Sequence, residues 1–293
     1  MSEPVVRAEA VSATDSLPKG TQYRVLFDQR TVTSFETYEH QIGESIKSER
    51  RTHIRKIAID GAPYCLKIYR YPGLSGFRTW YLRSKAQREY TALSRCEFLH
   101  VNAVVPVGYS VARNKLGFVK QCCLLTQWES EKTVFKDWLG DEYHPESKRD
   151  ALKLQGFLFE IGRQLKMLHE NHLFMLTPFS KNIFVDPNQS GPESIQFLDA
   201  PYARELRSTS AAIWGQVRDL GAVVASTRKY VDQETFHAFY EGYGVDPFPK
   251  PNQSLDEKAD VGSRVQLKQT LLPLALRMIR RGKRGKPSRK VDE

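Results

Sequence analysis

Four polar residues, taken in order along the chain, have the side-chain types needed to move a phosphoryl group. Lys67 lies in an alternating, strand-like segment and Glu89 lies in the helical pattern that follows, whereas Asn182 and Asp199 flank two short apolar runs. A lysine in mid-strand can reach nucleotide phosphates, and a helix glutamate can pair with it and fix its position. Amide and carboxylate oxygens are ligands that Mg²⁺ accepts. The set therefore predicts phosphoryl transfer that uses Mg-ATP.

The elements that must position Lys67 are expected to be paired strands. Residues 52–60 alternate in hydrophobicity, Asp60-Gly61 is a hairpin turn signal, and residues 64–69 alternate again. Successive side chains of a strand point to opposite faces, so Lys67 is predicted on the face opposite to Leu66.

The helix that carries Glu89 is expected over residues 78–98, where apolar residues recur at helical spacing. Two further strands are expected over residues 103–111 and 118–128, and the polar residues 129–150 are interpreted as a linker between two lobes.

Asn182 and Asp199 are expected on a long-looped β-hairpin that follows a helix. Residues 151–169 carry one apolar stripe at helical spacing, which predicts the clearest helix of the chain. Residues 182–185 and 195–198 are mostly apolar and flank a turn-rich segment, and the chain from residue 211 onward is interpreted as helical.

This order of elements indicates an α+β fold with two lobes, a small antiparallel sheet with one helix and then a mostly helical part. We divide the chain into a disordered lead-in over 1–20, a nucleotide-binding N-lobe over 21–130, a helical C-lobe over 131–263, and a terminal helix with a basic tail over 264–293.

Short segments in this order resemble the kinases that phosphorylate inner-core sugars of lipopolysaccharide. The resemblance covers roughly residues 30–225 and implies a protein-kinase-like fold. The segments that carry it are Glu49-Arg50-Arg51-Thr52, Cys65-Leu66-Lys67-Ile68, Leu168-His169, Asn182-Ile183-Phe184-Val185 and Leu198-Asp199.

The resemblance implies a role for each candidate residue, with ATP and Mg²⁺ as cofactors and a glycolipid or lipopolysaccharide core sugar as acceptor. Lys67 would contact the nucleotide phosphates and Glu89 would pair with it. Asn182 and Asp199 would bind Mg²⁺. Asp219, within Arg218-Asp219-Leu220-Gly221, resembles the helix acid that braces the catalytic loop.

The sequence departs from the kinase pattern at Thr177. Kinase-like enzymes place a catalytic aspartate five residues before the metal-binding asparagine, and the corresponding triplet here is Met175-Leu176-Thr177. Threonine cannot act as a carboxylate base, and base catalysis typically contributes about 10²- to 10⁴-fold. Phosphoryl transfer depends mainly on positioning, so two hypotheses stay open: a slow kinase, and a pseudokinase that acts as a scaffold or regulator in cell-envelope biogenesis.

The candidate residues also have purely structural interpretations. Lys67 could be a strand lysine with its ammonium in water. Glu89 could pair with Lys85 on its own helix face. The two hairpin residues could simply form its turn, and Asp219 could be an exposed helix acid.

The basic charge of the 293-residue chain is concentrated at one end. Residues 277–290 hold eight Lys or Arg and no acid, and subtracting these from the net charge of +10 leaves about +2. The preceding apolar stripe and this tail predict either an amphipathic anchor on an anionic membrane or a packed helix with a solvated tail. Nucleic acid is the weakest partner hypothesis, because the tail has no interleaved aromatic residues.

The remaining composition favours a cytoplasmic protein, with peripheral attachment to the inner face of the inner membrane as an extension of that prediction. No run of 18 apolar residues is present, and the first 20 residues lack the pattern of a secretory signal. The four cysteines have no zinc-ligand spacing, and a reducing compartment suits them.

Overall fold

The computed structural model describes residues 21–24, 43–59, 61–72, 83–232 and 234–244. The chain forms two compact units, which we call unit 1 (Met1–Glu97 with Val104–Ser130) and unit 2 (Phe98–Ala103 with Glu131–Glu293). The predicted lead-in over 1–20 and the terminal helix and tail over 264–293 lie outside the described residues.

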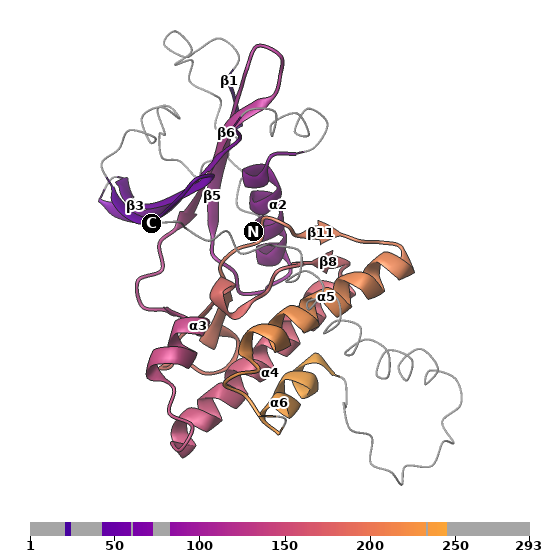
Figure 1. Cartoon of the computed structure of the whole chain (residues 1–293). Helices are drawn as coiled ribbons and strands as arrows, with labels where there is room; N and C mark the ends of the chain where they lie inside the picture. The colour runs from indigo at the N-terminus through magenta and orange to yellow at the C-terminus, as the bar shows by residue number, and fades with distance from the viewer. Residues whose placement is uncertain (1–20, 25–42, 60, 73–82, 233, 245–293) are drawn as a thin grey trace, which may run out of the picture. The chain divides into compact units, whose positions relative to one another are not determined.

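Unit 1 is built on an antiparallel sheet of six described strands, in the order β1-β5-β6-β4-β3-β2 (Figure 1). The strands are β1 (Thr21–Arg24), β2 (Glu44–Glu49), β3 (Thr52–Ile59), β4 (Ala62–Arg70), β5 (Pro106–Arg113) and β6 (Val119–Gln127).

The β3–β4 hairpin has the predicted turn and the predicted faces. Ile59 is opposite Ala62, so two residues join the strands, and Gly61 has a φ of +80°, which glycine adopts without steric cost. Leu66 and Ile68 pack in a buried cluster on one face of the sheet. Lys67 projects from the other face, toward the helix of this unit.

That helix, α2, spans Lys85–Phe98 and is shorter than predicted. Residues 78–82 lie outside the described part of the chain, and the helix begins only after Ser84. The Ser84 hydroxyl accepts a hydrogen bond from the Gln87 amide at 3.2 Å, which is how a serine caps a helix start. The apolar spacing in the sequence extends across Ser84, so it did not indicate that the helix begins there.

Unit 2 is mostly helical (Figure 1). Its helices are α3 (Phe135–Asp137), η3 (Trp138–Glu142), α4 (Lys148–Glu170), η4 (Ser180–Asn182), η5 (Gly191–Ser194), α5 (Thr209–Thr227) and α6 (Thr235–Tyr243). Its strands are β7 (Thr133–Val134), β8 (Leu173–Phe174), β9 (Ile183–Val185), β10 (Ile195–Phe197) and β11 (Arg204–Glu205). The α+β fold class with a sheet lobe and a helical lobe is confirmed.

The interpretation of residues 129–150 as a polar linker was wrong, because the segment contains β7, α3 and η3. Phe135 and Trp138 are buried and stack on each other at 6.3 Å between ring centroids. The ring of Trp138 also meets that of Phe157 on α4 edge-on at 5.1 Å. Two large aromatic residues therefore anchor a segment whose average composition is polar.

Helices α4 and α6 pack closely because glycine occupies the contact on each side. A Cβ atom added to Gly162 of α4 would lie 2.2 Å from the Phe239 carbonyl oxygen, and one added to Gly242 of α6 would lie 2.0 Å from the Phe159 carbonyl oxygen. Backbone atoms cannot move aside as a flexible side chain can, so this packing requires both glycines.

We predict that Gly162→Ala lowers the free energy of unfolding by about 1–3 kcal/mol, because the methyl group overpacks the α4–α6 contact. Gly156→Ala is the matched control on the same helix, where an added Cβ meets nothing within 4 Å. The control is expected to be neutral or stabilising by up to about 1 kcal/mol, through helix propensity. Urea unfolding followed by circular dichroism measures both, and equal effects would contradict the close contact.

Candidate functional site

In unit 1, Lys67 and Glu89 form a buried ion pair. Lys67 lies in the middle of β4 and donates from Nζ to Glu89 Oε1 at 2.7 Å, and the two residues are 3% and 0% exposed. An ion pair in this environment is sustained only with good geometry and further hydrogen bonds, because both charges have lost their water. The interpretation of Lys67 as a strand lysine with its ammonium in water was wrong.

Two tyrosines, one on β4 and one just after its end, connect this part of the chain further to α2. The Tyr69 hydroxyl donates to Glu89 Oε2 at 2.5 Å, and the Tyr71 hydroxyl accepts from the Lys85 amide at 2.9 Å. Burial raises the pKa of Tyr71 well above its usual range, so this hydroxyl stays protonated. The sequence analysis assigned Tyr69 no role, although its spacing of two residues from Lys67 was the signal available.

In unit 2, backbone and side-chain hydrogen bonds bring Thr177, Asn182 and the segment before Asp199 together. Asn182 Nδ2 donates to the Thr177 carbonyl oxygen at 2.8 Å. The Leu198 amide donates to the Asn182 carbonyl oxygen at 2.9 Å. These contacts fix the loop between β8 and β9 against the segment that follows β10.

Asp219 on α5 is fully buried and holds the start of the same loop. Its Oδ2 accepts from the Met175 amide at 2.8 Å and lies 3.0 Å from His169 Nε2. His169 Nδ1 in turn lies 2.7 Å from the Tyr243 hydroxyl. Burial, and then the charge of Asp219, raise the pKa of Tyr243, so the protonated hydroxyl can donate to Nδ1 while Nε2–H faces Asp219. The interpretation of Asp219 as an exposed helix acid was wrong.

The residues around Thr177 hold an unusual backbone conformation. Leu176 has a φ of +63°, in the left-handed region that a branched side chain rarely adopts. Arg218 Nε donates to the Leu176 carbonyl oxygen at 3.1 Å, which helps to hold it there. The Thr177 Oγ1 atom is buried and has no hydrogen-bond partner among the described residues. Such an orphaned hydroxyl indicates a position where a ligand or a different side chain would complete the contacts.

The donor atoms beside this loop suit a hard divalent cation. Because Asn182 uses its amide nitrogen in the loop, its Oδ1 oxygen is the atom chemically suited to a cation. Asp199 follows β10 by two residues and adds a carboxylate to the same neighbourhood. The described residues hold no cluster of three His, Cys, Asp or Glu side chains that could bind a metal ion. The donor set, one amide and one carboxylate oxygen, therefore fits Mg²⁺ that keeps waters or phosphate oxygens as further ligands.

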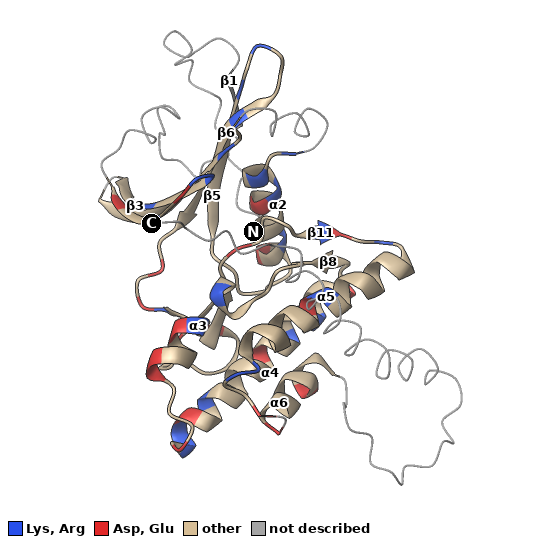
Figure 2. Cartoon of the chain, viewed as in Figure 1, with Lys and Arg blue, Asp and Glu red and all other residues tan. Residues whose placement is uncertain are grey.

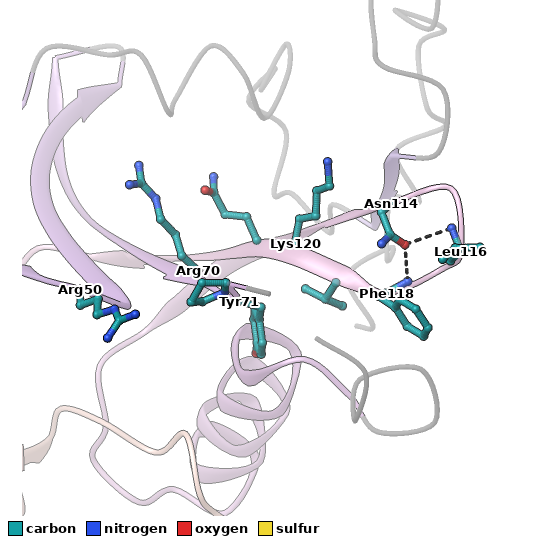
Figure 3. Close-up of a pocket in the computed structure, with 10 residues that line it drawn as sticks. Arg50, Arg70, Tyr71, Asn114, Leu116, Phe118 and Lys120 are labelled. Atoms are coloured by element: carbon teal, nitrogen blue, oxygen red, sulfur yellow. Dashed lines mark hydrogen bonds between the residues drawn. The ribbon is translucent and has the colours of Figure 1, made fainter. Parts of the chain in front are cut away.

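A pocket of about 560 Å³ lies elsewhere in unit 1, at the ends of β4 and β6 (Figure 3). Arg70, Tyr71, Phe118 and Lys120 are among the residues that line it, and none of the six predicted site residues does. The pocket and the candidate phosphoryl-transfer residues are therefore separate features.

Comparison with known proteins shows a likeness to a solved structure. No family model and no curated protein matches the sequence. A solved structure described as WaaP in complex with acyl carrier protein aligns with a TM-score of 0.60 at 14% sequence identity. The alignment covers 84% of this chain and 91% of that chain. The chain has a WaaP-like kinase fold. This confirms the fold that the short kinase-like segments implied.

We predict that Lys67→Met lowers the free energy of unfolding by about 3–5 kcal/mol, because Glu89 stays buried without this cation. The double variant Lys67→Met/Glu89→Leu should recover part of that loss, since it removes both charges. Lys47→Met is the control: its pair with Glu49 at 2.9 Å is solvent-exposed, and exposed pairs contribute about 0–1 kcal/mol. Urea unfolding of the variants measures these changes, and a double variant no more stable than Lys67→Met would contradict the prediction.

Proposed function

We propose that this chain binds Mg-ATP and transfers phosphate to a sugar hydroxyl of a glycolipid of the lipopolysaccharide class. The observation that carries the proposal is the buried Lys67–Glu89 pair in a WaaP-like kinase fold. An ammonium group fixed by a carboxylate and ready to meet phosphate oxygens is a recurring part of kinase sites.

The residues of unit 2 supply the other half of this chemistry. Asn182 and Asp199 would hold Mg²⁺, which neutralises the charge on the transferring phosphate when it is bound. Asp219 would keep the loop from Met175 to Thr177 in place through its bond to the Met175 amide. Each of these roles is assigned to a residue of the loop itself, of the segment after β10, or of α5.

Thr177 supports a second candidate function, a pseudokinase. Its side chain has no charge with which to accept a proton from an acceptor hydroxyl. A protein with this loop could bind nucleotide and act as a scaffold or regulator in envelope biogenesis. Positioning and electrostatic stabilisation account for most of phosphoryl-transfer catalysis, so we favour slow transfer over none.

The acceptor is proposed from the resemblance to lipopolysaccharide inner-core sugar kinases. A partner is proposed from the solved neighbour, which is WaaP in complex with acyl carrier protein. We propose a core sugar as the acceptor and an acyl carrier protein as a candidate partner of this chain. None of the described helices is long and apolar enough to cross a membrane. Peripheral contact with the cytoplasmic face through the basic tail remains part of the proposal.

We predict that wild-type protein binds Mg-ATP and that Asp199→Asn weakens this binding by about 10- to 100-fold, because a metal ligand loses its charge. Asp141→Asn is the control: it removes the same charge from an exposed residue of η3 in the same unit. Isothermal titration with and without EDTA measures the affinity, and circular dichroism checks the fold. Equal affinities for the two variants would sink the metal assignment.

We predict that Thr177→Asp raises the rate of phosphate transfer from ATP to lipopolysaccharide by about 10²- to 10⁴-fold, because it supplies a carboxylate base. Thr177→Asn has nearly the same shape without the charge and should leave the rate unchanged. Transfer of radiolabelled γ-phosphate measures the rates. If nucleotide binds but neither wild-type protein nor Thr177→Asp transfers phosphate, the pseudokinase is the correct function.

A further inference from the structure

Two turns of unit 1 and the end of β4 lie at one end of the sheet. Thr52 pairs with Tyr69, and Arg70 pairs with Gln121, so the turn between β2 and β3 lies beside the end of β4 and the start of β6. Two backbone hydrogen bonds join these segments. The Arg70 amide donates to the Arg51 carbonyl oxygen at 2.9 Å, and the Tyr71 amide donates to the Lys120 carbonyl oxygen at 2.8 Å. The turn that joins β5 to β6 belongs to the same end.

This end of the sheet is strongly cationic. Its three segments, residues 50–51, 70–72 and 113–121, contain six Lys or Arg and no Asp or Glu. Five of the six cations are exposed: Arg50, Arg51, Arg70, Lys115 and Lys120. The loop between β5 and β6 and the start of β6 show this charge in blue in Figure 2. A positive surface of this kind attracts anionic partners and is sensitive to salt.

An exposed leucine stands at the tip of the β5–β6 turn. Leu116 is 71% exposed and follows Lys115. Two hydrogen bonds hold the turn: Asn114 Oδ1 accepts from the amides of Leu116 and Phe118 at 3.0 and 2.9 Å, as Figure 3 shows. The leucine is thus held outward by local structure. A single exposed leucine is ordinary, but one at the tip of a cationic surface can enter a lipid layer.

The pocket described above opens at this same end. Its cationic lining residues are Arg50, Arg70 and Lys120, and its apolar walls come from Pro72, Leu116 and Val119 together with Tyr71 and Phe118. In Figure 3, Arg70 and Lys120 extend in the same direction from neighbouring strands. Cations beside apolar walls match a phosphate that carries hydrocarbon.

We propose that this end of the sheet binds the surface of an anionic membrane, with the cations on lipid phosphates and Leu116 among the upper acyl chains. The observations favour a lipid layer over an acidic protein, because the pocket has apolar walls and the outermost residue of the turn is apolar. The surface contains none of the candidate phosphoryl-transfer residues, and none of its residues belongs to the basic stretch over 277–290.

The test uses the full-length protein and vesicles of phosphatidylcholine with or without phosphatidylglycerol, and measures the bound fraction by co-sedimentation. Wild-type protein should bind only the anionic vesicles. Arg50→Gln/Lys120→Gln should lower the partition coefficient about 30-fold, since each charge at such a surface contributes on the order of 1 kcal/mol. Leu116→Ser should lower it about tenfold, because the leucine then has no acyl chains to enter.

Lys148→Gln/Arg149→Gln is the matched control, since it removes two exposed charges from α4 in unit 2. It should leave vesicle binding within about twofold of the wild-type value, because its charges lie outside the proposed surface. An equal loss in this control would show that overall charge alone drives binding and would overturn the proposal. Two other results would overturn it: unchanged binding of Leu116→Ser, or binding to soluble polyglutamate, but not to vesicles, that Arg50→Gln/Lys120→Gln abolishes.

Discussion

A buried ammonium group must lie beside a carboxylate, and unit 1 is arranged around that requirement. Lys67 projects from the middle of β4, so α2 can bury its inner face only where Glu89 meets this side chain. The tyrosine at position 69 adds a hydroxyl to the same carboxylate. The ion pair and the tyrosine bond therefore fix α2 to β4 beside the buried apolar residues of the helix.

Unit 2 also buries a charged group, the carboxylate of Asp219. Asp219 is buried without an arginine or lysine among the contacts described above, and a backbone amide and an imidazole face its carboxylate instead. That arrangement holds Met175 and, through the neighbouring Arg218, the left-handed Leu176. The backbone of this loop is thus held in place although residue 177 has no charge, so its conformation does not depend on a carboxylate at that position.

The sequence revealed features that depend on short-range periodicity. Strand alternation predicted the face of Lys67, and the turn at Gly61 followed from its chemistry. Phe135 and Trp138 were missed because a polar stretch conceals two isolated aromatic residues whose partner, Phe157, is distant in sequence. The sequence also did not reveal the cationic end of the sheet, since only the strand register brings its two turns and the end of β4 together. Both features that the sequence did not reveal depend on long-range pairing and not on local propensity.

The glycine contacts between α4 and α6 are reciprocal, and they fix the position of α6 along α4. Gly162 faces the backbone of one helix and Gly242 faces that of the other, so neither helix can slide along its axis without forcing a side chain into a carbonyl group. The left-handed Gly244 ends α6 two residues later. Gly244 lies against the side chain of Lys166 on α4, so the carboxyl end of α6 is held at one place along α4.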